Sequence, residues 1–140
     1  MSWSHLLVAV AASPESHLLV SKAVALARPC GARISLITFT LDPEMYNQFA
    51  APMLENMREL ALEETHNFLT ELIREANYPI NEAIVATGEL GEHIRHFCQR
   101  QNVDLVICGN HNHSPIARTL CSAKTIIASS PVDSLLISLP

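Results

Sequence analysis

Short apolar runs alternate with amphipathic helical patterns from one end of the chain to the other. This alternation is typical of a parallel sheet whose strands are joined by helices. Several runs consist almost entirely of Val, Ile and Leu, as expected for parallel strands that are buried on both faces. We therefore predict an α/β fold with a single open five-stranded parallel sheet and helices on both faces, in the order βαβαβαβαβ. The expected strands are residues 6–10, 33–39, 82–87, 104–108 and 134–139.

Four helical patterns lie between these runs. Ser13, Pro14 and Glu15 provide an N-cap, a proline at the first helical position and an acidic residue in the first turn, which together predict a helix start. Apolar residues that recur every three or four positions predict the remaining helices, of which the first is the longest. These helices are expected over residues 52–76, 90–98 and 117–128.

Residues 41–51 fit neither the strand nor the helix pattern. They contain Asp42-Pro43 and two aromatic residues, and we expect a mobile flap or a short helix there. The chain of 140 residues has the usual size of a single domain, and no linker, internal repeat or low-complexity tract divides it. We expect residues 1–140 to form one domain.

Composition excludes several classes of protein. The chain is 49% hydrophobic and only 16% charged, so it has enough apolar surface to fold rather than stay disordered. Its 9 basic and 14 acidic residues give a net charge of -5, which offers no general attraction for a phosphate backbone. The apolar runs are far shorter than the roughly 20 residues of a membrane-spanning helix. We expect neither nucleic-acid binding nor a membrane anchor.

The cysteines and the first residues bear on the compartment. The four cysteines are widely spaced without a CxxC pair, which argues against zinc ribbons and redox dithiols. Residues 1–5 carry no basic region ahead of an apolar stretch, so export is not indicated. We expect a cytoplasmic protein with reduced thiols.

Three loops are the expected place for a ligand. In open parallel sheets, ligands bind beyond the carboxyl ends of the strands, where the strand order reverses. The loops at that edge are residues 11–14 after the first strand, 88–91 after the third and 109–114 after the fourth.

The chain resembles the universal stress protein family at these loops and in the strands that lead to them. The matching features are the apolar run 7–10 followed by Ser13, Gly88 before a helix, the run Val103-Asp104-Leu105-Val106-Ile107-Cys108-Gly109, the pair Ser122-Ala123 and residues 131–137. The resemblance covers essentially the whole chain and implies the Rossmann-like fold of the adenine nucleotide alpha hydrolase group. Within the family, residues 42–48 and 111–114 are most similar to one bacterial paralogue.

The glycine pattern of nucleotide-binding family members is largely missing. Those members carry a glycine, two residues, a second glycine, nine residues, and a third glycine followed by Ser or Thr. Here only Gly109 matches, because Asn112 and Ser122 stand at the later glycine positions and Ala123 at the hydroxyl position. Glycine lets backbone amides approach phosphates with no Cβ in the way, so its loss weakens the phosphate loop. Ala11 also stands where such members carry an aspartate. These departures resemble the A-like branch of the family, which lacks ATP binding.

The resemblance implies a stress-response role without a catalytic cycle or a cofactor. It implies a cytoplasmic homodimer that is made in growth arrest or stress and contributes to resistance against DNA-damaging and oxidative conditions. Heterodimers with paralogues and signalling proteins as partners stay open. The alternative is a switch protein that binds a nucleotide such as ATP or AMP weakly through Gly109, His111, His113 and Ser122.

The degenerate loop keeps polar residues that could hold an anion. Asn110, Ser114, Ser122 and Lys124 are expected beside the amide groups at the start of the last helix, which attract phosphate. His111 and His113 are two residues apart, but a zinc site needs three or four ligands, so no metal is expected.

Other reactive residues have structural explanations. His93 and His96 are one turn apart on the third helix, as on any solvated helix face. Cys108 lies in an apolar run, and we expect a buried thiol there. No GxSxG elbow supports a hydrolase.

Residues 132–139 are predicted to form an edge strand. An open apolar edge tends to be covered by its own domain or paired with another chain. With the family resemblance in view, we expect the strand to pair with its copy in a dimer, through residues that include Val132, Ser134 and Leu136.

Overall fold

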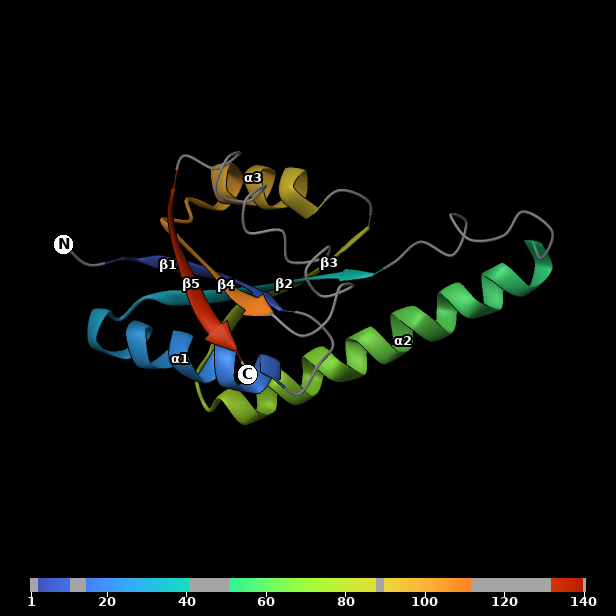
Figure 1. Ribbon diagram of the computed structural model, residues 1–140, viewed down its shortest axis with the longest axis horizontal. Coiled ribbons are helices and arrows are strands. Elements are labelled where there is room, and N and C mark those ends of the chain that lie inside the picture. The colour runs from blue at the N-terminus through green and yellow to red at the C-terminus, as the bar shows by residue number, and fades with distance from the viewer. Residues whose placement is uncertain (1–2, 11–14, 41–50, 88–89, 112–131, 140) are drawn as a thin grey trace.

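A computed structural model describes residues 3–10, 15–40, 51–87, 90–111 and 132–139. These residues form a five-stranded sheet and three helices (Figure 1). The strands are β1 His5–Val10, β2 Arg33–Thr40, β3 Ile80–Thr87, β4 Leu105–His111 and β5 Asp133–Leu139, and the helices are α1 Glu15–Cys30, α2 Ala51–Ala76 and α3 Leu90–Gln101.

The sheet is parallel throughout, with the strand order β3-β2-β1-β4-β5. Helix α3 covers one face, whereas α1 and α2 cover the other (Figure 1). The predicted fold class is confirmed. The order also reverses direction between β1 and β4, which are neighbours in the sheet although they are far apart in the sequence.

Alternate residues of each strand supply the two halves of the core. In β1, Leu6 and Val8 belong to the cluster beneath α1 and α2, whereas Leu7 and Ala9 belong to the cluster beneath α3. This division follows from the two-residue period of a strand, which points successive side chains to opposite faces. Burial on both faces explains why the strand sequences contain so few polar residues.

Helix α1 owes its place to a regular apolar stripe and ends at a glycine. Its buried residues recur at three- and four-residue intervals, which keeps them on the face toward the sheet. Gly31 follows with a φ of 63°, and the amide of Ala32 donates to the carbonyl of Ala27 at 3.1 Å. This is a Schellman ending, in which a left-handed residue allows the last carbonyls to be satisfied. Asn77 and Asn102 take the same left-handed conformation after α2 and α3.

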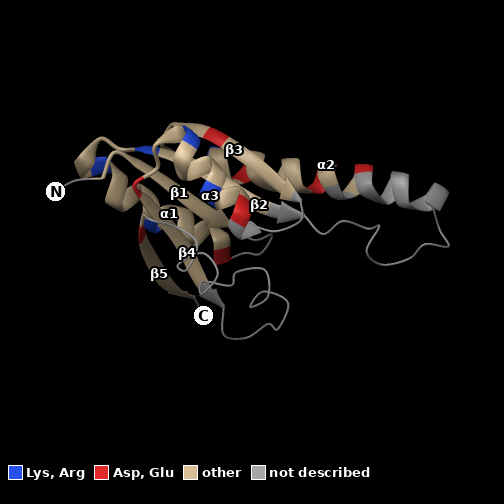
Figure 2. Cartoon of the chain, turned by 90° about the horizontal axis from the view of Figure 1, so that it is seen from above, with Lys and Arg blue, Asp and Glu red and all other residues tan. Residues whose placement is uncertain are grey.

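Helix α2 is 26 residues long, and its buried contacts lie near its C-terminus. Leu69 and Leu72 are buried against the sheet, whereas Leu60 is 58% exposed. Figure 1 shows the N-terminal part of α2 extending past the sheet, and Figure 2 shows acidic positions spaced along this helix. The predicted helix is thus confirmed.

Element boundaries differ from the predictions by a few residues. Strand β4 starts after Asp104 and continues to His111, and β3 starts two residues earlier than predicted. The predicted helix over residues 117–128 lies outside the described residues, as do residues 41–50 of the irregular segment predicted over 41–51, whose last residue, Ala51, begins α2. Among the helices described, none is both long and apolar enough to cross a lipid bilayer.

Candidate functional site

Strands β1 and β4 are neighbours in the sheet, and the strands that follow them in the sequence, β2 and β5, lie on opposite sides of this pair. Val8 of β1 pairs with Ile107 of β4, so Gly109, two residues on, lies level with Val10 at the end of β1. Gly109 is buried and pairs with Ile137 of β5. The strand order therefore brings Gly109 to the switch point where this class of sheet binds ligands.

The rest of the predicted phosphate loop is only partly described. The loop does not begin at Gly109, because Gly109 to His111 continue β4 and pair with Ile137 to Leu139 of β5. Asn112, His113, Ser122 and Lys124 lie outside the described residues, as does Ala11. The degenerate phosphate site therefore stays a prediction.

Strand β5 lies at one edge of the sheet, as predicted. Of the residues predicted for a dimer edge, Val132 is half-buried just before the strand, whereas Ser134 and Leu136 are exposed. Leu136 is 45% exposed, a large fraction for a leucine in a strand. Leu135 and Ile137 instead pack toward α1 and α2. One face of β5 is thus anchored to the core while Leu136 is open to contact.

The first residue of β5 is also tied to the start of the chain. The indole N–H of Trp3 donates to the carboxylate of Asp133 at 3.2 Å. Trp3 packs against the core cluster beneath α1 and α2. The contact fixes the amino end of β5 to the body of the protein.

At the amino ends of the strands, Asp104 joins β4 to β1. Its carboxylate accepts hydrogen bonds from the amides of Ser4 and His5 and from the Ser4 hydroxyl, at 2.9 to 3.2 Å. Burial acts to raise the pKa of this carboxyl, but these hydrogen bonds outweigh burial and lower the pKa below the ordinary value of 3.8. Asp104 was predicted to be the first residue of a strand. In the structure it lies just before β4, and its side chain binds two neighbouring amides.

Next to Asp104, a fully buried histidine is satisfied at both ring nitrogens. Nδ1 of His5 lies 3.0 Å from the carbonyl of Gln101, which can only accept, so Nδ1 carries the proton. Nε2 lies 2.7 Å from the oxygen of the buried Ser35 hydroxyl, and Asn81 donates to the same oxygen at 3.4 Å. Sequence patterns gave no signal for this network, because its members come from three different strands and a helix.

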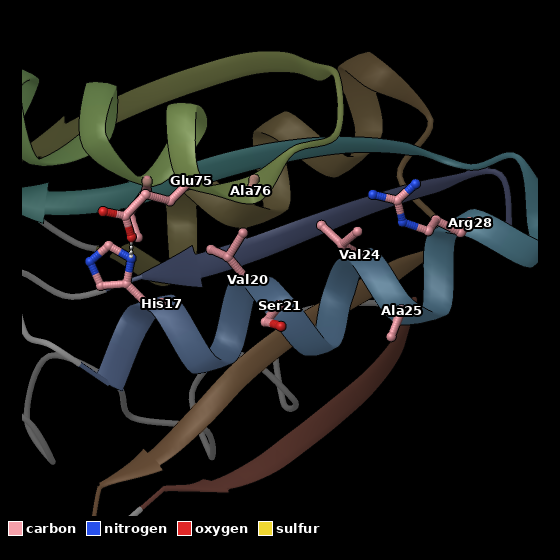
Figure 3. A pocket seen from close by; sticks show the side chains of 9 residues that line it. His17, Val20, Ser21, Val24, Ala25, Arg28, Glu75 and Ala76 are labelled. Carbon is pink, nitrogen blue, oxygen red and sulfur yellow. Dashed lines mark ion pairs between the residues drawn. The ribbon is translucent and has the colours of Figure 1, made fainter.

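A groove of about 500 Å³ lies between α1 and α2 (Figure 3). Val20, Val24 and Leu72, all buried, form its apolar floor, and Figure 3 shows Arg28 toward one end. Toward the other end, Nδ1 of His17 lies 2.8 Å from a carboxylate oxygen of Glu75. The sequence did not reveal this groove, since it depends on how two helices pack.

The predictions for the histidines of α3 and for Cys108 agree with the structure. His93 and His96 are both exposed on α3. Cys108 is fully buried, with Sγ 3.9 Å from the carbonyl of Leu135. Within the ranges that the structure describes, no three His, Cys, Asp or Glu side chains are grouped so that they could hold a metal ion.

Comparison with known proteins identifies the family. A sequence model of the universal stress protein family matches residues 2–137. The chain is 58% identical to universal stress protein C of Escherichia coli K12 over 139 residues, which cover 99% of this chain and 98% of the relative. That relative is the paralogue expected from residues 42–48 and 111–114. Identity to universal stress protein A of Escherichia coli K12 is 38% over 140 residues, with 99% and 96% covered.

Solved structures share the fold at lower sequence identity. A universal stress protein in complex with cAMP has a TM-score of 0.69 at 20% identity, with 99% of this chain and 98% of that chain covered. The universal stress protein from Archaeoglobus fulgidus in complex with dAMP has a TM-score of 0.63 at 15% identity, with both chains fully covered. At these identities the likeness supports the fold alone.

Proposed function

Because the chain belongs to the universal stress protein family, we propose that it is a cytoplasmic stress-response protein that works without catalysis, as a homodimer that binds other proteins. The single observation that carries this proposal is the position of β5. Within the described part of the chain, β5 pairs with β4 on one side, and no strand lies on its other side.

An edge strand of this kind is a template for pairing. Its outer amide and carbonyl groups can form a ladder with a second strand, and Leu136 adds exposed apolar surface in the middle of β5. Two copies related by a two-fold axis perpendicular to the sheet pair antiparallel. Antiparallel pairing about the middle of Asp133–Leu139 brings Leu136 opposite its own copy.

The family resemblance supplies the biological role in this proposal. The protein acts in growth arrest or stress and contributes to resistance against DNA-damaging agents, with paralogues and signalling proteins as candidate partners. The departures from the nucleotide pattern at Asn112, Ser122 and Ala11 support action through protein contacts rather than phosphate chemistry. A deletion strain should lose survival after DNA damage and regain it with the wild-type gene.

Sedimentation of the purified chain tests the dimer. The wild type should sediment as a dimer at micromolar concentration. Leu136→Lys should sediment as a monomer, because two ammonium groups would face each other across the two-fold axis. Leu60→Lys, at an exposed leucine on α2, should stay dimeric. A monomeric wild type, or a Leu136→Lys variant that stays dimeric, would refute β5 pairing.

Weak nucleotide binding is the second candidate function. It is favoured by Gly109 at the switch point and by the cAMP and dAMP complexes of the two structural neighbours. A ligand that binds only the folded state raises the unfolding temperature. Millimolar Mg-ATP or AMP should leave that temperature unchanged if the phosphate loop is degenerate. A rise with adenine nucleotides but not with Mg-GTP would instead support the switch.

A further inference from the structure

The groove between α1 and α2 combines an apolar floor with a fixed cation. Val20, Val24 and Leu72, all buried, form the floor. Ser21 and Ala25, which also line the groove from α1, have small side chains (Figure 3). Its volume of about 500 Å³ is within the range of small-molecule sites in proteins. All of its lining residues belong to α1 and α2, and none belongs to β4 or β5.

Arg28 is held in place at its end of the groove. One guanidinium nitrogen donates to the carbonyl of Asn77 at 2.8 Å, and the guanidinium carbon lies 5.5 Å from the centre of the Tyr78 ring. The Tyr78 hydroxyl in turn donates to the carbonyl of Ala32. A cation with fewer free rotamers loses less entropy when it binds an anion.

No acidic side chain in the described part of the chain neutralises the charge of Arg28. In residues 15–40 and the other described segments, no carboxylate lies within ion-pair distance of Arg28. The carbonyl of Asn77 uses only one of the five guanidinium N–H groups. The remaining donors suit a carboxylate, which guanidinium groups bind in a two-point geometry.

The opposite end of the groove does not favour a second anion. His17 is already paired with Glu75, whose carboxylate would repel another negative group. His17 and Arg28 are eleven residues apart on α1, which is about 16 Å along the helix axis. The groove therefore fits a ligand with one anionic group and an elongated apolar body.

We propose that this groove binds an amphipathic monocarboxylate, with its carboxylate on Arg28 and its apolar chain along Val20 and Val24. Each methylene that the groove buries strengthens binding by up to about fourfold. Ser21 and Ala25 lie along the path of the chain, so a bulky residue there fills the site. The site depends neither on the β5 edge nor on the phosphate loop.

Amide chemical shifts of the full-length, isotope-labelled chain test the proposal, with decanoate as the probe. Decanoate should shift amides of α1 and of Asn77 and Tyr78 in a saturable way at millimolar concentration. Octanoate should bind more weakly than decanoate, and hexanoate more weakly still. Decanol should bind at least about tenfold more weakly, because it lacks the charge that Arg28 recognises. Equal binding of decanol and decanoate would overturn the role of Arg28.

Two matched pairs of variants locate the ligand. Arg28→Gln should weaken decanoate binding at least about tenfold, whereas Lys22→Gln, a cation on the same helix outside the groove, should bind within twofold of wild type. Ser21→Phe should block binding, whereas Lys22→Phe should not. Wild-type affinity in Arg28→Gln or Ser21→Phe, shifts confined to β4 or β5, or no saturable shift in the wild type would each refute the site. Sedimentation of the same variants shows whether each one is still a dimer, so that loss of decanoate binding can be distinguished from loss of the dimer.

Discussion

At the scale of single residues, polar side chains at the amino ends of the strands form hydrogen bonds that could not be predicted from the sequence. Asp104 was predicted as the first residue of a strand, in a run that resembles the family. The structure places it just before β4, where it binds the amides of Ser4 and His5. Likewise, His5 begins an apolar run but is satisfied by Ser35 and Gln101. Such roles depend on which strands are neighbours, and residue spacing alone does not determine that.

Asp104→Asn should destabilise the protein by about 1 to 2 kcal/mol at pH 7, since an amide accepts fewer hydrogen bonds than a carboxylate. The pKa of Asp104 is lower in the folded than in the unfolded state, so its stabilisation is present above the unfolded pKa of about 4 and is lost as pH falls through the folded pKa. The difference between wild type and variant in urea unfolding should therefore shrink toward about pH 3. A difference that is independent of pH would contradict this assignment.

Ser35→Ala should cost about 1 to 3 kcal/mol, because Nε2 of the fully buried His5 loses its hydrogen-bond partner. The comparison is Thr70→Ala, which removes an exposed hydroxyl bonded within α2 and should change the free energy of unfolding little. Chemical denaturation of both variants measures the difference. Equal effects of the two substitutions would mean that the His5 network adds nothing to stability.

At the scale of elements, hydrophobic periodicity predicted all five strands, including the edge strand, and the three helices that the structure describes. The boundaries shifted where pairing rather than composition decides them. Strand β4 continues through Gly109 to His111 because these residues pair with β5, although glycine and polar residues suggested a loop. Helix ends follow local chemistry, with left-handed Gly31, Asn77 and Asn102 after the three helices.

Gly31→Ala should destabilise the protein by about 1 kcal/mol, since an alanine is strained at the φ of 63° that ends α1. No atom lies within 4 Å of the added Cβ, so the cost comes from the backbone and not from a clash. Gly31→Asn should cost less, because asparagine tolerates the left-handed region. Thermal unfolding of both variants provides the test. An alanine variant as stable as the wild type would show that the end of α1 adopts another conformation.

At the scale of the whole molecule, the alternating pattern and the right-handed crossover rule predicted the sheet and its switch point. The strand order places Gly109 there and β5 at the edge. The groove between α1 and α2 could not be predicted, because its residues become neighbours only when the two helices pack at their observed offset. The fold class could thus be predicted from periodicity. The polar network at the amino ends of the strands and the groove could be identified only from the tertiary structure.

Hydrogen exchange along the two edge strands tests the central claim, that the protein acts as a dimer paired through β5. Both β3 and β5 lie at edges of the sheet, so β3 is an internal control in every sample. Raising the protein concentration through the association range should slow exchange of the β5 amides in the wild type and leave β3 unchanged, and Leu136→Lys should abolish the effect. Protection of β5 that does not depend on concentration, or concentration-dependent protection at β3 instead, would contradict the account.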